Sequence, residues 1–247
     1  MTRTLITITA RQLFNRRRVI LIGLLALVPL GVAVLYRLAN ETHADPPPIE
    51  FAPGIIDGLV VTALLPLGAL VFGTGALGAE IEDGTAVYLL AQPIARWRIL
   101  AAKVLVASLA TLLLTVPTTL VTALVILGGD DPDAISAGFV VGVGAGAIAY
   151  CCVFVALSTV TSRALLIGLG YVFVWEAFVT SIFSGTRWVS VRQYVLGLAD
   201  GISSAPASAF EAELDGRSAA VACAVLIAVS LALGVYFLER FEIGERL

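Results

Sequence analysis

The stretch that decides the fold is residues 104–127, VLVASLATLLLTVPTTLVTALVIL, which holds no charged side chain over 24 residues. An α-helix needs about 20 apolar residues to cross the hydrocarbon core of a bilayer. A transmembrane barrel is built from alternating segments of about ten residues, so an unbroken apolar run excludes it. Further apolar stretches occur at 19–38, 55–78, 135–160, 164–183 and 219–238. The sequence therefore predicts an all-α membrane protein with six transmembrane helices, which form a single transmembrane domain over residues 1–247.

The composition agrees with lipid as the main solvent. Hydrophobic residues make up 59% of the 247 residues and charged residues 13%, whereas soluble domains have about 25% charged residues. The formal net charge is -3, and no basic patch indicates a nucleic-acid partner. The three cysteines lie inside apolar stretches, which favours packing over a disulfide framework or a metal site. Many Arg residues with a single Lys are typical of a bacterial or archaeal genome.

Lys and Arg residues predict the orientation in the cell membrane, because cytoplasmic loops carry an excess of them. With both termini in the cytoplasm, 11 of the 15 Lys and Arg residues lie inside. The outer loops then carry most of the acids, including the run from Asp130 to Asp133. The predicted cytoplasmic set is Arg3, Arg11, Arg16, Arg17, Arg18, Arg96, Arg98, Lys103, Arg163, Arg240 and Arg246.

Residues 1–18 form an amphipathic pattern ahead of the first span. Ile6, Ala10, Leu13 and Phe14 fall on one helical face, and the opposite face carries Arg. Such a helix lies in the membrane interface with its apolar face in the acyl boundary. The alternative is that this segment is only a topology signal.

The segment EIEDGTAVYLLAQPIAR, residues 80–96, follows the second span. Its three acids stand where the positive-inside rule disfavours them. Thr85 can cap a two-turn helix that Pro93 ends, and Val87 and Leu90 give this helix an apolar face that needs a cover. Trp97, Arg98 and Lys103 are then expected to anchor the chain in the interface.

This segment resembles the one between spans two and three of ABC-2 type transporter permeases, including the nitrous-oxide-accessory permeases. The resemblance rests on the acids, Gly84-Thr85, Leu89-Leu90, Pro93-Ile94, Arg96 and Lys103. It implies a coupling helix that docks into an ABC ATPase subunit, in a complex of two permeases and two ATPase subunits. The second permease would be an identical copy or a related chain, and the direction of transport would be export. The residues implied in coupling are Glu80, Glu82, Asp83, Gly84, Thr85, Val87, Leu90, Pro93 and Arg96.

The ATPase is expected in the partner, with ATP and Mg bound there. A Walker A loop requires a Lys after Gly, and the only Lys, Lys103, stands between Ala102 and Val104. No catalytic residue, cofactor or metal is expected in this chain.

Glu176 lies inside the fifth span, where a carboxylate costs at least about 2.5 kcal/mol and indicates function or a specific partner. One interpretation is structural: Glu176 pairs with Arg187 or Arg192, or caps backbone donors of the outer segment 186–202. The other places Glu176 in the translocation path. The outer segment resembles the short re-entrant or interfacial helix of ABC-2 permeases, which implies a gate at the outer mouth.

Other function classes remain as alternatives. A secondary transporter could use Glu176 as a proton or cation site, and a third interpretation is a purely structural membrane subunit. An intramembrane enzyme is disfavoured, because the only His, His43, lies in an outer loop and hydrolytic sites at membrane depth need suitable acid–base or metal-binding pairs. In the fourth span, Gly138, Gly142 and Gly146 predict close helix packing within the chain rather than a dimer seam. The apolar walls suit lipophilic drugs, lipids or peptides, but the sequence does not identify the substrate.

Overall fold

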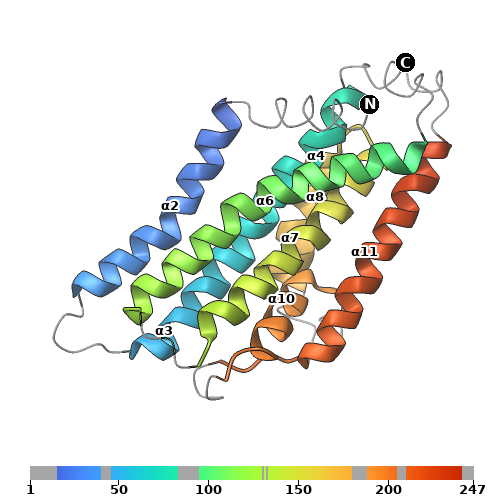
Figure 1. The fold of residues 1–247 in the computed structure, drawn as a ribbon. Coiled ribbons are helices and arrows are strands. Elements are labelled where there is room, and N and C mark those ends of the chain that lie inside the picture. The colour runs from blue at the N-terminus through green and yellow to red at the C-terminus, as the bar shows by residue number, and fades with distance from the viewer. Residues whose placement is uncertain are drawn as a thin grey trace.

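The computed structural model describes residues 16–39, 46–82, 95–129, 131, 133–179, 188–204 and 210–240, without the side chains of 16–19, 79, 81–82 and 177–179. Every regular element in these ranges is helical (Figure 1). The elements are α2 (Arg16–Ala39), α3 (Pro48–Ile55), the π-helix η1 (Ile56–Leu64), α4 (Leu65–Glu82), α6 (Arg96–Leu127), α7 (Ile135–Val160), α8 (Ala164–Gly170), the π-helix η2 (Tyr171–Val179), α10 (Val191–Asp200) and α11 (Gly216–Glu239).

Five helical segments in the described ranges are long and apolar enough to cross a membrane: Ile20–Ala39, Pro48–Gly78, Arg96–Leu127, Ile135–Val160 and Gly216–Glu239. Ala164–Glu176 is a shorter apolar helix. The predicted all-α, multi-span membrane fold is therefore confirmed. The predicted fifth span, 164–183, continues past the described part of the chain. The predicted interfacial helix at the N-terminus, most of the predicted coupling helix and Arg187 also lie outside the described residues.

Helix α7 is the centre of the bundle, because it packs against α4, α6, α10 and α11. Its small residues make this possible. A Cβ atom added to Gly138 would lie 2.5 Å from the Ala199 carbonyl oxygen, and one added to Gly142 would overlap the Val195 carbonyl oxygen. Both carbonyls belong to α10, so the glycines serve packing within the chain, as the sequence predicts.

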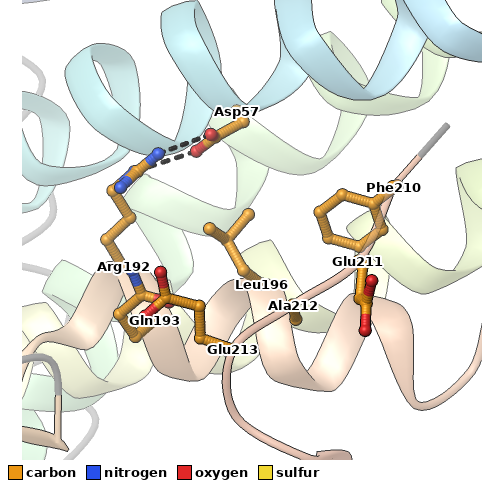
Figure 2. Close-up of a pocket in the computed structure, with 8 residues that line it drawn as sticks. All are labelled: Asp57, Arg192, Gln193, Leu196, Phe210, Glu211, Ala212 and Glu213. Carbon is orange, nitrogen blue, oxygen red and sulfur yellow. Dashed lines mark hydrogen bonds and ion pairs between the residues drawn. The ribbon is translucent and has the colours of Figure 1, made fainter. Parts of the chain in front are cut away.

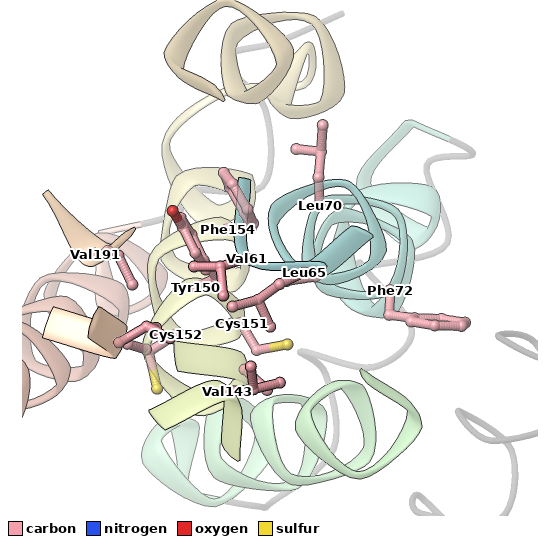
Figure 3. Close-up of a cluster of buried hydrophobic side chains, with 14 of the residues drawn as sticks. Val61, Leu65, Leu70, Phe72, Val143, Tyr150, Cys151, Cys152, Phe154 and Val191 are labelled. Carbon is pink, nitrogen blue, oxygen red and sulfur yellow. The ribbon is translucent and has the colours of Figure 1, made fainter. Parts of the chain in front are cut away.

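The core lies where η1, α4 and α7 meet (Figure 3). Tyr150 and Phe154 of α7 stack with ring centroids 5.9 Å apart, and both side chains are fully buried. Cys151 and Cys152 lie in the same cluster, and all three cysteines are free and buried. Cys151 Sγ is 3.2 Å from the Thr111 hydroxyl of α6. The cysteines therefore occupy packing positions, as expected from their apolar surroundings.

The two ends of the bundle differ in charge. At one end α2 begins, α4 ends, α6 begins and α11 ends (Figure 1). We call this the basic end, and its described basic residues are Arg16, Arg17, Arg18, Arg96, Arg98, Lys103, Arg163 and Arg240. The opposite, acidic end carries α3, α10, the turn between α6 and α7, and the start of α11. Its described acids are Glu50, Asp57, Asp131, Asp133, Asp200, Glu211, Glu213 and Asp215.

Two of these acids accept hydrogen bonds from backbone N–H groups at the start of a helix. Asp131 accepts hydrogen bonds from the backbone N–H groups of Ile135 and Ser136, at 2.9 and 2.8 Å. Asp215 is the N-cap of α11 and accepts from the Ser218 N–H at 3.2 Å, and hydrogen bonding by Ser218 lowers the pKa of this carboxyl. Carboxylates at these positions satisfy donors that a helix leaves open and oppose the positive end of its dipole.

Candidate gate and coupling sites

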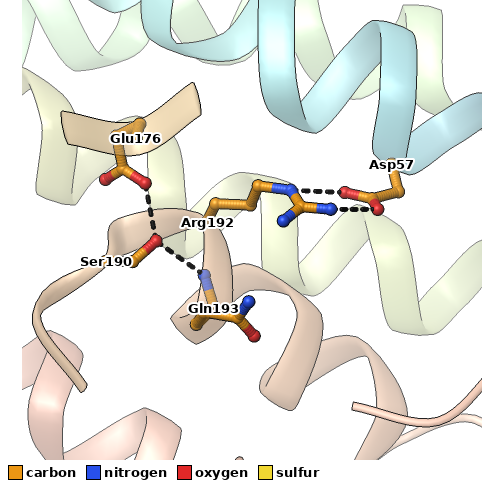
Figure 4. Close-up of polar contacts among 5 residues, drawn as sticks. All are labelled: Asp57, Glu176, Ser190, Arg192 and Gln193. Carbon is orange, nitrogen blue, oxygen red and sulfur yellow. Dashed lines mark hydrogen bonds and ion pairs between the residues drawn. The ribbon is translucent and has the colours of Figure 1, made fainter. Parts of the chain in front are cut away.

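The side chain of Glu176 is 5% exposed and accepts three hydrogen bonds within the described part of the chain. Its donors are the Ser190 hydroxyl at 2.6 Å, the Val191 backbone N–H at 2.9 Å and the Tyr171 hydroxyl at 3.0 Å. Figure 4 shows the carboxylate directed at Ser190, just before α10 begins. A buried carboxylate is tolerated when it is hydrogen-bonded in this way. This is the contact that the capping interpretation of Glu176 describes.

Local structure brings these groups together from both sides. Ser190 is the N-cap of α10, and its Oγ accepts from the Gln193 N–H at 3.4 Å while it donates to Glu176. The carboxylate thus faces the N-terminus of α10, where the helix dipole favours negative charge. On the other side, η2 is a π-helix, in which backbone bonds join residues five apart. Tyr171 and Glu176 have this spacing, so their side chains meet on one face.

Arg192 pairs with Asp57 and not with Glu176, its partner in one of the alternatives that the sequence left open. Its Nε donates to Asp57 Oδ1 at 2.9 Å and its second terminal nitrogen donates to Oδ2 at 2.5 Å. Both side chains are about a quarter exposed. The pair is bidentate (Figure 4), which is the strong geometry for a guanidinium and a carboxylate. The physical reason for the difference is that Arg192 leaves α10 toward η1, whereas the N-terminus of α10 faces η2.

Sequence reasoning missed Asp57 as a site residue. One signal was available: Asp57 is an acid at the outer end of the apolar stretch 55–78. The predicted outer segment, which contains Arg192, is expected at the same side of the membrane. Asp57 lies in η1 and Glu176 in η2. The helix α10 is therefore joined by a carboxylate to each of the two described π-helices.

Packing adds to these polar contacts. Helix α10 lies at the acidic end beside α7 and α11 (Figure 1). It buries Val191, Tyr194, Val195, Leu196 and Ala199. The predicted outer segment, 186–202, thus contains a short helix over Val191–Asp200 whose apolar face is packed into the bundle.

A cavity of about 410 Å³ opens beside α10 at the acidic end (Figure 2). Three carboxylates and one guanidinium line it, together with an amide and three apolar side chains. The lining residues are Asp57, Arg192, Gln193, Leu196, Phe210, Glu211, Ala212 and Glu213.

At the basic end, Lys103 of α6 forms an ion pair with Glu80 near the end of α4, with Nζ 2.6 Å from Oε1. The Lys103 residue is 1% exposed. The expectation that Lys103 anchors the chain in the interface is therefore wrong, because its side chain turns inward to Glu80. Trp97 fits the anchor role better, since it is 57% exposed and the Arg98 guanidinium lies 5.3 Å from its ring centre.

The ion pair joins Glu80, the first residue of the predicted coupling segment, to Lys103, which lies beyond the last residue of that segment. Glu80 stands near the end of α4, and Arg96, the last residue of the segment, begins α6. Glu82 belongs to α4, but its side chain is not described. The remaining predicted coupling residues, Asp83, Gly84, Thr85, Val87, Leu90 and Pro93, lie outside the described residues.

Taken together, the apolar spans and the helical bundle that they form define a multi-span membrane protein. The family model for ABC-2 family transporter proteins matches residues 10–242, so the chain belongs to this family. It is thus a membrane-spanning permease subunit of an ABC transporter and not itself the ATPase. Among curated proteins, none matches the chain. The likeness to nitrous-oxide-accessory permeases in particular is not confirmed.

Proposed function

We propose that the chain is the permease of an exporter in the cell membrane, where it couples ATP hydrolysis by a separate subunit to movement of a substrate. The family match over residues 10–242 carries this proposal. Members of the ABC-2 family work with an ATP-binding subunit, which would hold ATP and Mg. The complex would contain two permeases, identical or related, and two ATP-binding subunits.

The ATP-binding subunit would dock on residues 80–96. The ion pair of Glu80 and Lys103 supports this role, because it joins the helix before the segment to the helix after it. A displacement of the segment by the ATP-binding subunit would then move α4 and α6 together. Because both helices pack against α7, which also packs against α10, this movement would be transmitted to the acidic end of the bundle. Glu80 serves here as an internal clamp, while Glu82 and Asp83 would face basic residues of the partner.

Helix α10 would be the outer gate. Glu176 holds its N-terminus and Asp57 holds Arg192, so that movement of either π-helix would move α10. A π-helix inside a longer helix often marks a functional position. The alternative is a secondary transporter that uses Glu176 as an ion site. The three donors around Glu176 favour the gate, because they fix the carboxylate as an acceptor for α10.

The basic end would face the cytoplasm, since Lys and Arg gather there. A cysteine replacing Glu213, which is exposed at the acidic end, should react with an impermeant maleimide added to intact cells. A cysteine replacing Asp83 should react only after the cells are opened. The three native cysteines are buried and provide a low background. Labelling of the Asp83→Cys variant from outside would reverse the orientation.

Coupling can be tested without a known substrate. In the purified complex, trapping the ATP-binding subunit with ATP and vanadate should change the maleimide reaction rate of the Glu213→Cys variant, because α10 and the segment before α11 are expected to move with the bundle. A cysteine replacing Glu50, which is exposed in α3 at the acidic end, is the control and should keep its rate. Equal rates at Glu213→Cys with and without nucleotide would count against ATP-driven gating and in favour of the secondary transporter.

A further inference from the structure

The hydroxyl of Tyr150 is buried in the centre of the bundle without a hydrogen bond. Tyr150 belongs to α7, and its side chain is fully buried. Within the described part of the chain, no donor or acceptor lies at hydrogen-bond distance from the hydroxyl. A buried hydroxyl in this condition is unfavourable. A phenylalanine would fill nearly the same space without this cost, so packing alone does not explain the hydroxyl.

Aromatic packing fixes this hydroxyl beside η2 and the start of α10. The Tyr150 ring stacks on Phe154 at 5.9 Å, and Phe154 meets the Tyr171 ring edge-on at 6.3 Å. Val191, the first residue of α10, lies in the same buried cluster (Figure 3). The Glu176 carboxylate is close enough to act on the Tyr150 hydroxyl electrostatically, although no hydrogen bond joins them. A small shift of either group would allow one.

The three donors that bind Glu176 differ in the element to which they belong. Ser190 and Val191 form the N-terminus of α10 and would leave with this helix, whereas Tyr171 lies in η2 together with Glu176. A buried carboxylate that loses two donors is unfavourable unless another donor replaces them. Tyr150 provides such a donor from α7, and its hydroxyl is unused while α10 is packed against α7.

We infer that Tyr150 is the second hydrogen-bond partner of Glu176, used when α10 leaves α7. While α10 is docked on α7, Ser190 and Val191 donate to the carboxylate. Once α10 is released, the Tyr150 hydroxyl donates to it instead. The exchange keeps the carboxylate paired in both states and brings their free energies closer, as a two-state element requires. The inference rests on the proposed gate role of α10 and does not need the ATP-binding subunit.

Release of α10 can be measured as the exposure of a thiol at position 195. Val195 is fully buried in α10, and its side chain packs against Gly146 of α7. A cysteine is smaller than valine and fits there, and it should react with maleimide only when α10 leaves α7. The sample is the full-length Val195→Cys permease in phosphatidylcholine nanodiscs. When opening and closing are faster than labelling, the labelling rate reports the released fraction, and the permease without Val195→Cys gives the background.

Tyr150→Phe, added to this reporter, should lower the labelling rate by about tenfold, because a hydrogen bond to a charged group is lost from the released state alone. The thermal midpoint should not fall, since the hydroxyl has no bond to lose in the docked state and the ring keeps its contact with Phe154. Tyr171→Phe makes the same chemical change at a hydroxyl that does bind Glu176 and should lower the midpoint.

Ser190→Ala should have the opposite effect on labelling. It removes a donor that Glu176 uses only while α10 is docked, so the labelling rate should rise by about tenfold and the thermal midpoint should fall. Two variants that each remove one hydroxyl near the same carboxylate would thus shift the released fraction in opposite directions.

An unchanged labelling rate in Tyr150→Phe would overturn the inference, and so would a midpoint lowered as much as in Tyr171→Phe, because the hydroxyl would then be idle or already bonded. Faster labelling of Ser190→Ala in the same experiment would still support α10 as a gate. A reporter at position 195 that does not react even in Ser190→Ala would show that α10 stays docked, and the gate and the role of Tyr150 would fail together.

Discussion

Replacing Val87 and Leu90 by Asp should release the ATP-binding subunit from the permease. The two-turn helix predicted at 85–92 would be too short to be stable alone, and its predicted apolar face would need a cover. A buried Val or Leu contributes about 1.5–3 kcal/mol relative to exposure, so the double variant should lose two or more orders of magnitude in affinity. The measurement is the amount of ATP-binding subunit that copurifies with a tagged permease.

The permease itself should stay folded in detergent, because the predicted docking face would be uncovered whenever the partner is absent. Glu82→Arg should weaken the complex less, since charges at the rim of an interface mainly set association rate and specificity. Glu50→Arg, a charge reversal at the acidic end, is the control and should retain the subunit. If the Val87→Asp, Leu90→Asp variant keeps its full complement and normal nucleotide response, residues 80–96 are not the docking segment.

Glu176→Gln should lower the free energy of unfolding by about 2 kcal/mol, because charge-assisted hydrogen bonds to a buried carboxylate are replaced by weaker ones. Part of this loss arises from the amide group, which puts a donor against donors of Tyr171, Ser190 and Val191. The measurement is an unfolding titration in mixed micelles. Unchanged stability together with lost transport would contradict this account and place Glu176 in the translocation path.

A double-mutant cycle with Ser190→Ala identifies the contact. Glu176→Gln and Ser190→Ala both alter the 2.6 Å hydrogen bond. The loss in free energy of unfolding for the double variant should therefore be smaller than the sum of the two single losses by about 0.5 kcal/mol or more. Asp57→Asn is the matched control, since it removes a carboxylate that holds the same helix through Arg192. Its loss should add to that of Ser190→Ala.

Local sequence patterns were sufficient for the spans and for the packing of α7. Five of the predicted spans lie within described helices, because an apolar stretch of about 20 residues has few alternatives in a bilayer. The glycines of α7 were informative for a similar reason: Gly138 and Gly142 face backbone carbonyls of α10, where a side chain would not fit.

The partners within the candidate sites could not be derived in this way. Arg192 and Asp57 are 135 positions apart in sequence, and which acid meets the guanidinium depends on how each helix is rotated about its axis. The π-helices add to the difficulty, since each shifts the faces of the residues that follow it. The role of Lys103 could not be predicted for a similar reason. A Lys near the end of a span can either anchor the chain in the interface or form a buried ion pair, and the local sequence does not distinguish the two.

The subunit composition of the purified wild-type complex tests the central claim most directly. Native mass spectrometry of the permease, coexpressed with an ATP-binding subunit from its own host, should give an assembly of two permeases with two ATP-binding subunits. The Val87→Asp, Leu90→Asp variant provides the dissociated reference. A wild-type permease that remains folded but carries no ATP-binding subunit would contradict the account.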